Sequence, residues 1–329
     1  MKILITGPAL VPEATAILEQ HNATIFTSTP YCPTQELQNT AEREQVDALI
    51  VRMGTITKDV ISASRKLRVI TKHGVGVNTI DVAAATALGI PVMITPAANA
   101  LAVAEHAVAL ILSLLRDVPN LDRGIRQGLW PKATTKGSEL SGKQVGIVGF
   151  GNIGRALLAL LKPFKVNMLI YDPYISLPEH TDCLSARQVD RLETLLAEVD
   201  ILSLHCPLTT ETENMIGRDE LRLMKPTAYL INTARGGIVD EAALTEALQN
   251  HTIGGAGLDT FSSEPPAKDH PLWLLPNVVF TPHIGGQTKE SFQRMGMRAA
   301  QNIIGVLTQN HIDTDCIVNP EVLNPAKKI

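Results

Sequence analysis

The fold is decided by one stretch of the chain, Gln144-Val145-Gly146-Ile147-Val148-Gly149-Phe150-Gly151-Asn152-Ile153-Gly154. Its first five residues are mostly apolar, which predicts a buried strand over Gln144–Val148. The segment Arg155–Leu161 that follows the glycines has the apolar pattern of a helix. A strand, a glycine-rich turn and a helix in direct succession are typical of the start of a Rossmann sheet.

The glycine-rich turn suits a bound dinucleotide. Gly149 allows the tight turn, Gly151 lets backbone amides approach a pyrophosphate, and Gly154 permits close packing of the helix on the strand. Asn152 and Ile153 open the helix, whose unpaired N–H groups and dipole favour phosphate. We therefore expect a dinucleotide site here.

A carboxylate follows at the position that a ribose would reach. Asp172 ends the next strand candidate, 18 residues after Gly154. A carboxylate there accepts hydrogen bonds from both ribose hydroxyls and repels a 2′-phosphate, which favours NAD over NADP. The alternative is that the glycines only form a turn and Asp172 only caps a loop. Strand, turn, helix and acid in register favour the cofactor site.

Strand candidates alternate with helical stretches through most of the chain. In the first hundred residues they are Lys2–Ile5, Ala23–Phe26, Asp47–Val51, Leu67–Thr71 and Pro91–Ile94. Later they are Gln144–Val148, Asn167–Tyr171, Ile201–Leu204, Tyr229–Asn232, Gly255–Leu258 and Val278–Phe280. This alternation predicts an α/β protein with two doubly wound parallel-sheet domains, the second having the six strands of a Rossmann sheet.

The domain layout is expected to be discontinuous. An apolar helix over about Ala100–Leu115 is the candidate crossover between domains, and a last helix near Ser291–Leu307 lies beyond the sixth late strand. We therefore predict one domain from residues 1–98 and 290–329, and a second from residues 99–289.

Composition excludes several classes of protein. The 329 residues are 45% hydrophobic and 19% charged, with a net charge of −4 and a pI of about 6.1. This balance indicates a globular protein without a basic field for nucleic acid or anionic membranes. The apolar run at the start of the sequence is too short for a signal peptide. The apolar run Leu101–Leu115 is too short to span a membrane.

The cysteines indicate neither a metal site nor a disulfide framework. Cys32, Cys183, Cys206 and Cys316 are scattered without CxxC spacing. We expect no bound metal and a reducing cytoplasmic location.

Three polar residues follow late strand candidates, where open α/β sheets bind ligands. Arg235 can hold a carboxylate bidentately and polarise a neighbouring carbonyl. The imidazole of His283 suits proton transfer near neutrality, and Glu264 can orient it and stabilise its charged form. Taken singly, Arg235 and Glu264 could form a surface salt bridge, and His283 could be a loop histidine with its hydrogen bonds satisfied. Together, beside a dinucleotide site, they predict hydride transfer coupled to proton transfer.

His205 and Cys206 suggest a nucleophilic dyad at first sight. Adjacent residues of a strand point to opposite faces, so their side chains are not expected to meet. We reject that interpretation.

The chain resembles the D-isomer-specific 2-hydroxyacid dehydrogenase family over nearly its whole length, nearest to the short phosphoglycerate dehydrogenase-like branch. The matching segments are Gly149–Gly154, Leu204–Thr209, Asn232–Asp240, Gly257–Phe261, Glu264-Pro265 and Thr281–Gly286. The resemblance implies a flavodoxin-like substrate domain, a Rossmann NAD-binding domain and a homodimer. It implies Arg235 as substrate clamp, His283 as general acid and base, and Glu264 as its partner.

The resemblance also implies further contacts. The NAD site would include His205, Cys206, Pro207, Thr233, Ala234, Asp259, His283 and Gly285, with Asp259 at the nicotinamide carboxamide. The substrate site would include Arg52, Lys72, Gly74, Val75, Gly76, Asn99 and Arg235, with the Gly74–Gly76 amides cradling the carboxylate. Two cations beside that cradle suggest a second anionic group. However, Lys72 stands where arginine is common and His73 where a small residue is usual, so solvated strand ends remain an alternative.

The resulting hypothesis is an NAD-dependent oxidoreductase that interconverts a small anionic D-2-hydroxy acid and its 2-oxo acid. Candidates are 3-phosphoglycerate with 3-phosphohydroxypyruvate, or unphosphorylated hydroxypyruvate or glyoxylate. An alternative of another class is an NADH-sensing protein like the corepressors that share this fold. The residues after Val318–Val322 are too few for a regulatory domain, so serine feedback is not expected.

Overall fold

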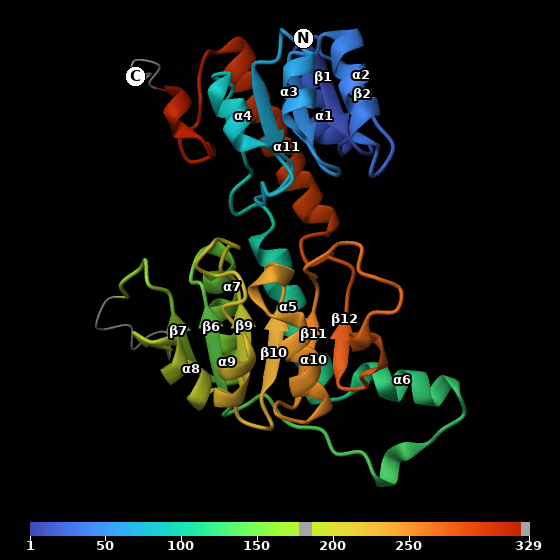
Figure 1. Cartoon of the computed structure of the whole chain (residues 1–329), viewed down its shortest axis with the longest axis vertical. Helices are drawn as coiled ribbons and strands as arrows, with labels where there is room; N and C mark the ends of the chain where they lie inside the picture. Colours follow the sequence, from blue (N-terminus) through green and yellow to red (C-terminus); the bar gives the residue numbers. More distant parts are fainter. Residues whose placement is uncertain (178–185, 324–329) are drawn as a thin grey trace. The chain divides into compact units, whose positions relative to one another are not determined.

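The computed structural model describes residues 1–177 and 186–323 (Figure 1). The chain divides into two compact units, Met1–Asn99 with Gln287–Ile329, and Ala100–Gly286. The divisions that we expected from the sequence were 98/99 and 289/290. Cys183 lies outside the described residues.

The first unit is built on a five-stranded parallel sheet in the order β2-β1-β3-β4-β5, the flavodoxin-like order. Its strands are β1 (Lys2–Thr6), β2 (Thr24–Thr27), β3 (Ala48–Val51), β4 (Val69–Lys72) and β5 (Val92–Met93). Its helices are α1 (Pro12–Glu19), α2 (Thr34–Glu44), α3 (Lys58–Ala63), α4 (Val82–Ala87) and α11 (Lys289–Thr308). Alternate residues of β1 face two separate cores, one shared with α1 and α11 and the other with α2, α3 and α4.

Helix α11 belongs to the first unit although it follows the whole second unit in sequence. It begins with a capping box, in which Thr288 Oγ1 accepts from the Ser291 amide and Ser291 Oγ accepts from the Thr288 amide. Two side chains then fix it to the end of the early segment: Arg294 Nε donates to the Ala98 carbonyl and Asn302 Nδ2 to the Ile94 carbonyl. These bonds, together with the packing of its apolar face against α1 and β4, hold α11 in the first unit.

The second unit has a seven-stranded parallel sheet in the order β12-β11-β10-β9-β6-β7-β8. Its strands are β6 (Gln144–Val148), β7 (Asn167–Tyr171), β8 (Ala186–Gln188), β9 (Ile201–Leu204), β10 (Tyr229–Asn232), β11 (Gly255–Leu258) and β12 (Val278–Phe280). Six have the bounds predicted from the sequence. The prediction of only six strands was wrong because β8 was missed. That strand is a short polar edge strand, paired on one side only, so it lacks an apolar run.

Helices cover both faces of this second sheet. They are α5 (Ala100–Leu115), α7 (Asn152–Leu161), α8 (Leu192–Glu198), α9 (Arg218–Leu223) and α10 (Glu241–Gln249). Helix α5 packs against α7, β10, β11 and β12, and its side chains Leu110, Ile111 and Leu114 are buried. An added Cβ at Gly257 would lie 3.1 Å from Leu110 Cβ, so glycine permits this close approach. Most of the apolar face of α5 is therefore used within the chain.

Helix α6 (Val118–Arg126) differs from the other described α-helices of this unit because it buries none of its residues. Figure 1 shows α6 and the segment after it extending away from the seven-stranded sheet. Leu129 and Trp130 in that segment are 58% and 78% exposed. Among the described residues, no helix is both long and apolar enough to cross a membrane.

Candidate active site

The glycine-rich loop between β6 and α7 is shaped by close backbone contacts. Gly149 has a φ of +88°, and a Cβ there would lie 2.6 Å from the Cys206 amide nitrogen. A Cβ on Gly154 would lie 2.4 Å from the Gly149 carbonyl oxygen. At Gly151, by contrast, an added Cβ would meet no described atom within 4 Å. The loop is therefore tightly packed on one side and open at Gly151.

Asp172 lies beside this loop, directly after β7. Its Oδ2 accepts a hydrogen bond from the Phe150 amide at 2.8 Å, and its Oδ1 accepts one from the Tyr174 amide at 3.0 Å. An ionised carboxylate has about four lone-pair positions, so each oxygen keeps acceptor capacity for a further donor. The acid is thus held next to the start of α7.

These residues fit a nicotinamide dinucleotide. The N-terminus of α7 has no side-chain cap among the described residues, and Asn152 and Ile153 form its first turn. The open backbone at Gly151 leaves room for phosphate near those amides. At the end of β10, the buried Thr233 hydroxyl has no hydrogen-bond partner within the described part of the chain. An orphaned buried hydroxyl at a strand end is one polar group that a bound ligand satisfies.

His205 and Cys206 lie in the loop after β9, not within a strand, so our reason for rejecting a dyad between them needs correction. The His205 amide donates to the Val148 carbonyl, and its Nε2 lies 2.8 Å from Ser203 Oγ. Burial lowers the pKa of His205 to about 4 and raises the pKa of the Cys206 thiol to about 11. A protonated, partly buried thiol is a poor nucleophile, so the dyad remains excluded.

Arg235 is positioned by a turn after β10. Asn232 holds this turn, because its Oδ1 accepts from the Ala234 amide and its Nδ2 donates to the Arg235 carbonyl. The Arg235 Nη1 donates to the Ala234 carbonyl at 2.6 Å. Burial lowers the pKa of the guanidinium, while nearby Glu264 opposes that effect. Arg235 is thus a partly buried cation close to a carboxylate.

His283 and Glu264 are in direct contact. His283 Nδ1 lies 2.6 Å from Glu264 Oε2, and Glu264 Oε1 accepts from the Phe261 amide at 3.1 Å. Burial raises the pKa of the Glu264 carboxyl, but the hydrogen bonds from His283 and Phe261 and the charge of Arg235 hold it below its ordinary value. The structure therefore brings Arg235, Glu264 and His283 together at the carboxyl ends of β10, β11 and β12.

The loop that carries His283 is fixed to Asp259, the residue after β11. The His283 backbone has a φ of +54°, which is uncommon for a residue with a side chain. Its amide donates to the Asp259 carbonyl at 2.7 Å. The Asp259 carboxylate, 1% exposed, accepts from the Gly285 amide at 2.8 Å. The unusual backbone of His283 is therefore held from both sides by Asp259.

The substrate residues expected in the first unit also lie at strand ends. Arg52 follows β3, and its Nη1 donates to the carbonyls of Pro8 and Ala9 at 2.5 and 2.6 Å. Its guanidinium lies 5.5 Å from the ring centroid of Phe292 on α11. Lys72, at the end of β4, donates from Nζ to the Arg52 carbonyl at 3.3 Å. Arg52 and Lys72 are thus neighbours within this unit.

The expected carboxylate cradle is only partly open. The Gly74 amide donates to the buried Thr95 hydroxyl at 3.0 Å, so the expectation that it faces the substrate needs correction. Val75 and Gly76 follow in the same loop, and Asn99 ends the segment before α5. His73 is partly buried beside Phe292, and desolvation and then the charges of Arg52 and Lys72 lower its pKa to about 4.

Two residues that hold the site had no role in the sequence prediction. Asn232 closes the Arg235 turn, and Thr281 donates its hydroxyl to Asp259 Oδ1 at 2.6 Å. Each is a polar residue at the end of an apolar strand, which is the pattern that could have identified it.

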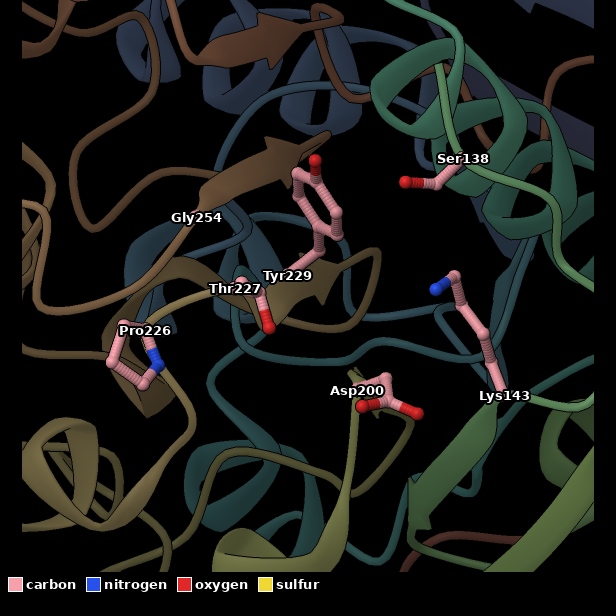
Figure 2. Close-up of a pocket in the computed structure, with 7 residues that line it drawn as sticks. All are labelled: Ser138, Lys143, Asp200, Pro226, Thr227, Tyr229 and Gly254. Carbon is pink, nitrogen blue, oxygen red and sulfur yellow. The ribbon is translucent and has the colours of Figure 1, made fainter. Parts of the chain in front are cut away.

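A cavity of about 260 Å³ lies at the amino-terminal ends of the strands of this sheet, opposite the ends that carry Arg235 and His283 (Figure 2). Lys143, Asp200 and Tyr229, which line it, stand before or at the first residues of β6, β9 and β10. Asp200 is paired there with Lys225 at 2.8 Å. Because the strands are parallel, this cavity is separated by the length of the sheet from the glycine-rich loop and His283.

Comparison with known proteins identifies the family of the chain. Residues 108–285 match the family described as D-isomer specific 2-hydroxyacid dehydrogenase, NAD binding domain. A D-3-phosphoglycerate dehydrogenase of Methanocaldococcus jannaschii is 41% identical over 93% of this chain and 57% of its own length. A hydroxypyruvate reductase of Thermotoga maritima is 42% identical over 79% of this chain and 84% of its own. The chain thus spans little more than half the length of the first of these relatives.

Among solved structures, the crystal structure of the TT0316 protein from Thermus thermophilus matches with a TM-score of 0.87. The two sequences are 34% identical, and the match covers 97% of this chain and all of that one. The likeness therefore extends through both units.

Proposed function

Because the chain belongs to the D-isomer-specific 2-hydroxyacid dehydrogenase family, we propose that it is an NAD-dependent oxidoreductase that interconverts a small D-2-hydroxy acid and its 2-oxo acid. One observation carries the proposal beyond family membership. The 2.6 Å contact of His283 with Glu264, near the partly buried Arg235, supports the proposal of an acid–base group and an anion clamp in the NAD-binding unit.

The proposed chemistry divides between cofactor and protein. When bound, NAD supplies the acceptor for the hydride that leaves the hydroxyl-bearing carbon. Arg235 holds the substrate carboxylate and polarises the oxygen that becomes the carbonyl. His283 takes the hydroxyl proton at Nε2, the ring nitrogen that Glu264 does not hold. Glu264 stabilises the imidazolium that forms, and in the reverse direction His283 returns the proton.

The cofactor preference follows from Asp172. Its carboxylate lies beside the glycine-rich loop, where it would accept hydrogen bonds from the ribose hydroxyls and repel a 2′-phosphate. The uncapped start of α7 would bind the pyrophosphate. The remaining cofactor contacts proposed from the family are His205, Cys206, Pro207, Thr233, Ala234, Asp259 and Gly285.

The first substrate candidate carries a phosphate, as in 3-phosphoglycerate. Arg52 and Lys72 support it because Lys72 Nζ contacts the Arg52 carbonyl and the charges of both side chains act on His73, at the ends of β3 and β4. Asn99 and the amides of Val75 and Gly76 complete the proposed binding residues of the first unit.

The second candidate is an unphosphorylated acid such as hydroxypyruvate or glyoxylate. It is favoured by one observation, that Arg52 already donates to two backbone carbonyls and stacks on Phe292. Engaged in this way, the guanidinium has less donor capacity for a phosphate.

A substrate panel with a matched variant separates these two candidates. Purified protein is assayed for NADH oxidation with 3-phosphohydroxypyruvate, hydroxypyruvate and glyoxylate, and the assay is repeated with Arg52→Gln. A phosphate site predicts that the variant loses at least about tenfold in kcat/KM for the phosphorylated acid alone. Equal effects on all the acids would reject the phosphate site. Failure of the wild-type protein to oxidise NADH with any 2-oxo acid would reject the proposed function.

Homodimerisation is part of the same proposal. Helix α6 buries none of its residues, and Val118, Ile125, Leu129 and Trp130 in and after it are each about half exposed or more. Contiguous exposed apolar residues usually mark an interface. Light scattering should give a dimer mass for the wild type and a smaller mass for Leu129→Asp with Trp130→Asp. A monomeric wild type at micromolar concentration would reject the dimer.

A cytoplasmic location is supported by the free thiols of Cys32, Cys206 and Cys316.

A further inference from the structure

His106, on helix α5, is connected to the loop of His283 through the partly buried Thr281 and the buried Asp259. Its Nε2 lies 2.8 Å from Thr281 Oγ1 and 3.5 Å from Asp259 Oδ1. The His106 side chain is 19% exposed and that of Asp259 1%. A histidine on a crossover helix therefore touches the residues that begin and anchor the His283 loop.

The direction of these hydrogen bonds can be worked out. The Asp259 carboxylate only accepts, so the 2.6 Å contact with Thr281 uses the single hydroxyl hydrogen of Thr281. Thr281 Oγ1 must then accept from His106, which requires a hydrogen on His106 Nε2. His106 is consequently a donor to this pair in either of its protonation states.

The Asp259 carboxylate, which His106 and Thr281 hold in place, is also hydrogen-bonded to backbone amides of the loop. Its Oδ1 accepts from the Ile284 amide at 2.9 Å and its Oδ2 from the Gly285 amide at 2.8 Å. Burial raises the pKa of Asp259, but the hydrogen bonds from His106, Thr281 and the two amides lower it below its ordinary value. The buried carboxylate therefore stays charged and keeps all of these donors.

Packing restricts the same loop. An added Cβ at Gly285 would lie 2.9 Å from Asp259 Oδ2 and 3.4 Å from His106 Cδ2. The imidazole of His106 thus closes one side of the space in which the loop turns. Between the anchored Thr281 and Ile284, the His283 backbone keeps its φ of +54°, and its ring keeps the contact with Glu264.

We infer that His106 is a positioning residue for the reaction, acting through Thr281 and Asp259 to hold His283 in its working geometry. The inference rests on the proposed function, because the proposed function assigns the proton transfer to His283. Positioning of this kind affects turnover more than cofactor binding, because misplacement of a reacting group by about 1 Å costs about a hundredfold in rate.

The test uses His106→Phe, which keeps a ring but removes the donor, and His106→Gln, whose amide donates from a similar place. For His106→Phe we expect kcat to fall by about ten- to a hundredfold while the Kd of NADH stays within about threefold. His106→Gln should recover most of that kcat. The matched control is His251→Phe, at an exposed turn between α10 and β11 at the opposite edge of the sheet.

Thr281→Val provides a second route if His106→Phe fails to fold. It removes the hydroxyl that couples His106 to Asp259 and should reproduce the loss of kcat, with Thr281→Ser restoring it. Combining Thr281→Val with His106→Phe should cost less than the sum of the single effects, because both act through one contact.

Hydrogen exchange separates this inference from the proposed function. The amides of His283, Ile284 and Gly285 should exchange faster in His106→Phe and Thr281→Val than in the wild type, His106→Gln or the His251→Phe control. A wild type without dehydrogenase activity would reject the proposed function but leave this readout intact. Unchanged kcat and unchanged exchange in both His106→Phe and Thr281→Val would overturn the role of His106.

Discussion

Glu264 and His283 are joined by a 2.6 Å contact between Oε2 and Nδ1, although they come from different loops and 18 residues separate them. The contact fixes the ring while the Phe261 amide fixes the other carboxylate oxygen. A carboxylate placed in this way stabilises the charged imidazole that forms when a hydroxyl proton is taken up. The charge of Glu264 should therefore matter more than its shape.

Removing that charge should reduce turnover. We expect Glu264→Gln to lower kcat by about ten- to a hundredfold, and His283→Ala by about 10²- to 10⁴-fold, with the Kd of NADH little changed in both. Steady-state kinetics with NADH fluorescence titration measures the two effects. Glu241→Gln is the control, because Glu241 pairs with His270 in the same unit at 3.2 Å. A larger loss of kcat in the control than in Glu264→Gln would contradict the assigned pair.

Asp172 should control the choice between NADH and NADPH. Asp172→Asn keeps an oxygen that can accept from the Phe150 amide but removes the negative charge. The ratio of kcat/KM for NADPH to that for NADH should rise by about tenfold or more, which corresponds to about 1.4 kcal/mol of lost repulsion. An unchanged ratio would show that the 2′-phosphate is excluded by something other than this carboxylate.

Replacing glycines of the cofactor loop by alanine should have two different effects, one on stability and one on NADH binding. Gly154→Ala should lower the free energy of unfolding by about 1–3 kcal/mol, because its Cβ would overlap the Gly149 carbonyl. Gly151→Ala should fold with wild-type stability and instead weaken NADH binding, since its Cβ would project into the open side of the loop. Denaturant unfolding and NADH titration check this pair, and the reverse pattern would contradict the proposed pyrophosphate position.

The acid sensitivity of the first unit should depend on His73. Its pKa is lowered to about 4 in the folded protein by burial and by Arg52 and Lys72, so the unfolded chain binds the proton first. Stability should be full above about pH 6.5 and fall as pH decreases toward 4, by at most about 3 kcal/mol. His73→Gln should flatten this dependence, whereas His311→Gln, at an exposed position, should not. Parallel pH profiles for wild type and His73→Gln would contradict this origin.

The sequence predicted the second sheet well because its central strands are buried on both faces. Gln144–Val148 and Ile201–Leu204 are almost uninterrupted apolar runs, so their bounds were correct. In the first unit, Pro91–Ile94 was predicted too long, because only Val92 and Met93 pair with β4. Edge strand β8 carries no comparable apolar pattern and was missed.

Residues of the candidate site that belong to a local sequence motif could be proposed from the sequence. Residues whose position depends on tertiary contacts could not. Arg235 and His283 closely follow apolar strands, Glu264 follows β11 by six residues, and all three were proposed from the sequence. The bond from Gly74 to Thr95 joins residues far apart in sequence, and so do those from Arg52 to Pro8 and Ala9. The role of His106 depends on a helix packing against β11 and β12, which no local spacing reveals.

The most direct test of the central claim is NADH oxidation by the purified protein with a panel of 2-oxo acids, followed by chiral analysis of the product. The account predicts turnover with at least one acid, a D-2-hydroxy acid as product, and loss of that turnover in His283→Ala while NADH still binds. No turnover with any acid, an L-product, or wild-type turnover in His283→Ala would contradict it.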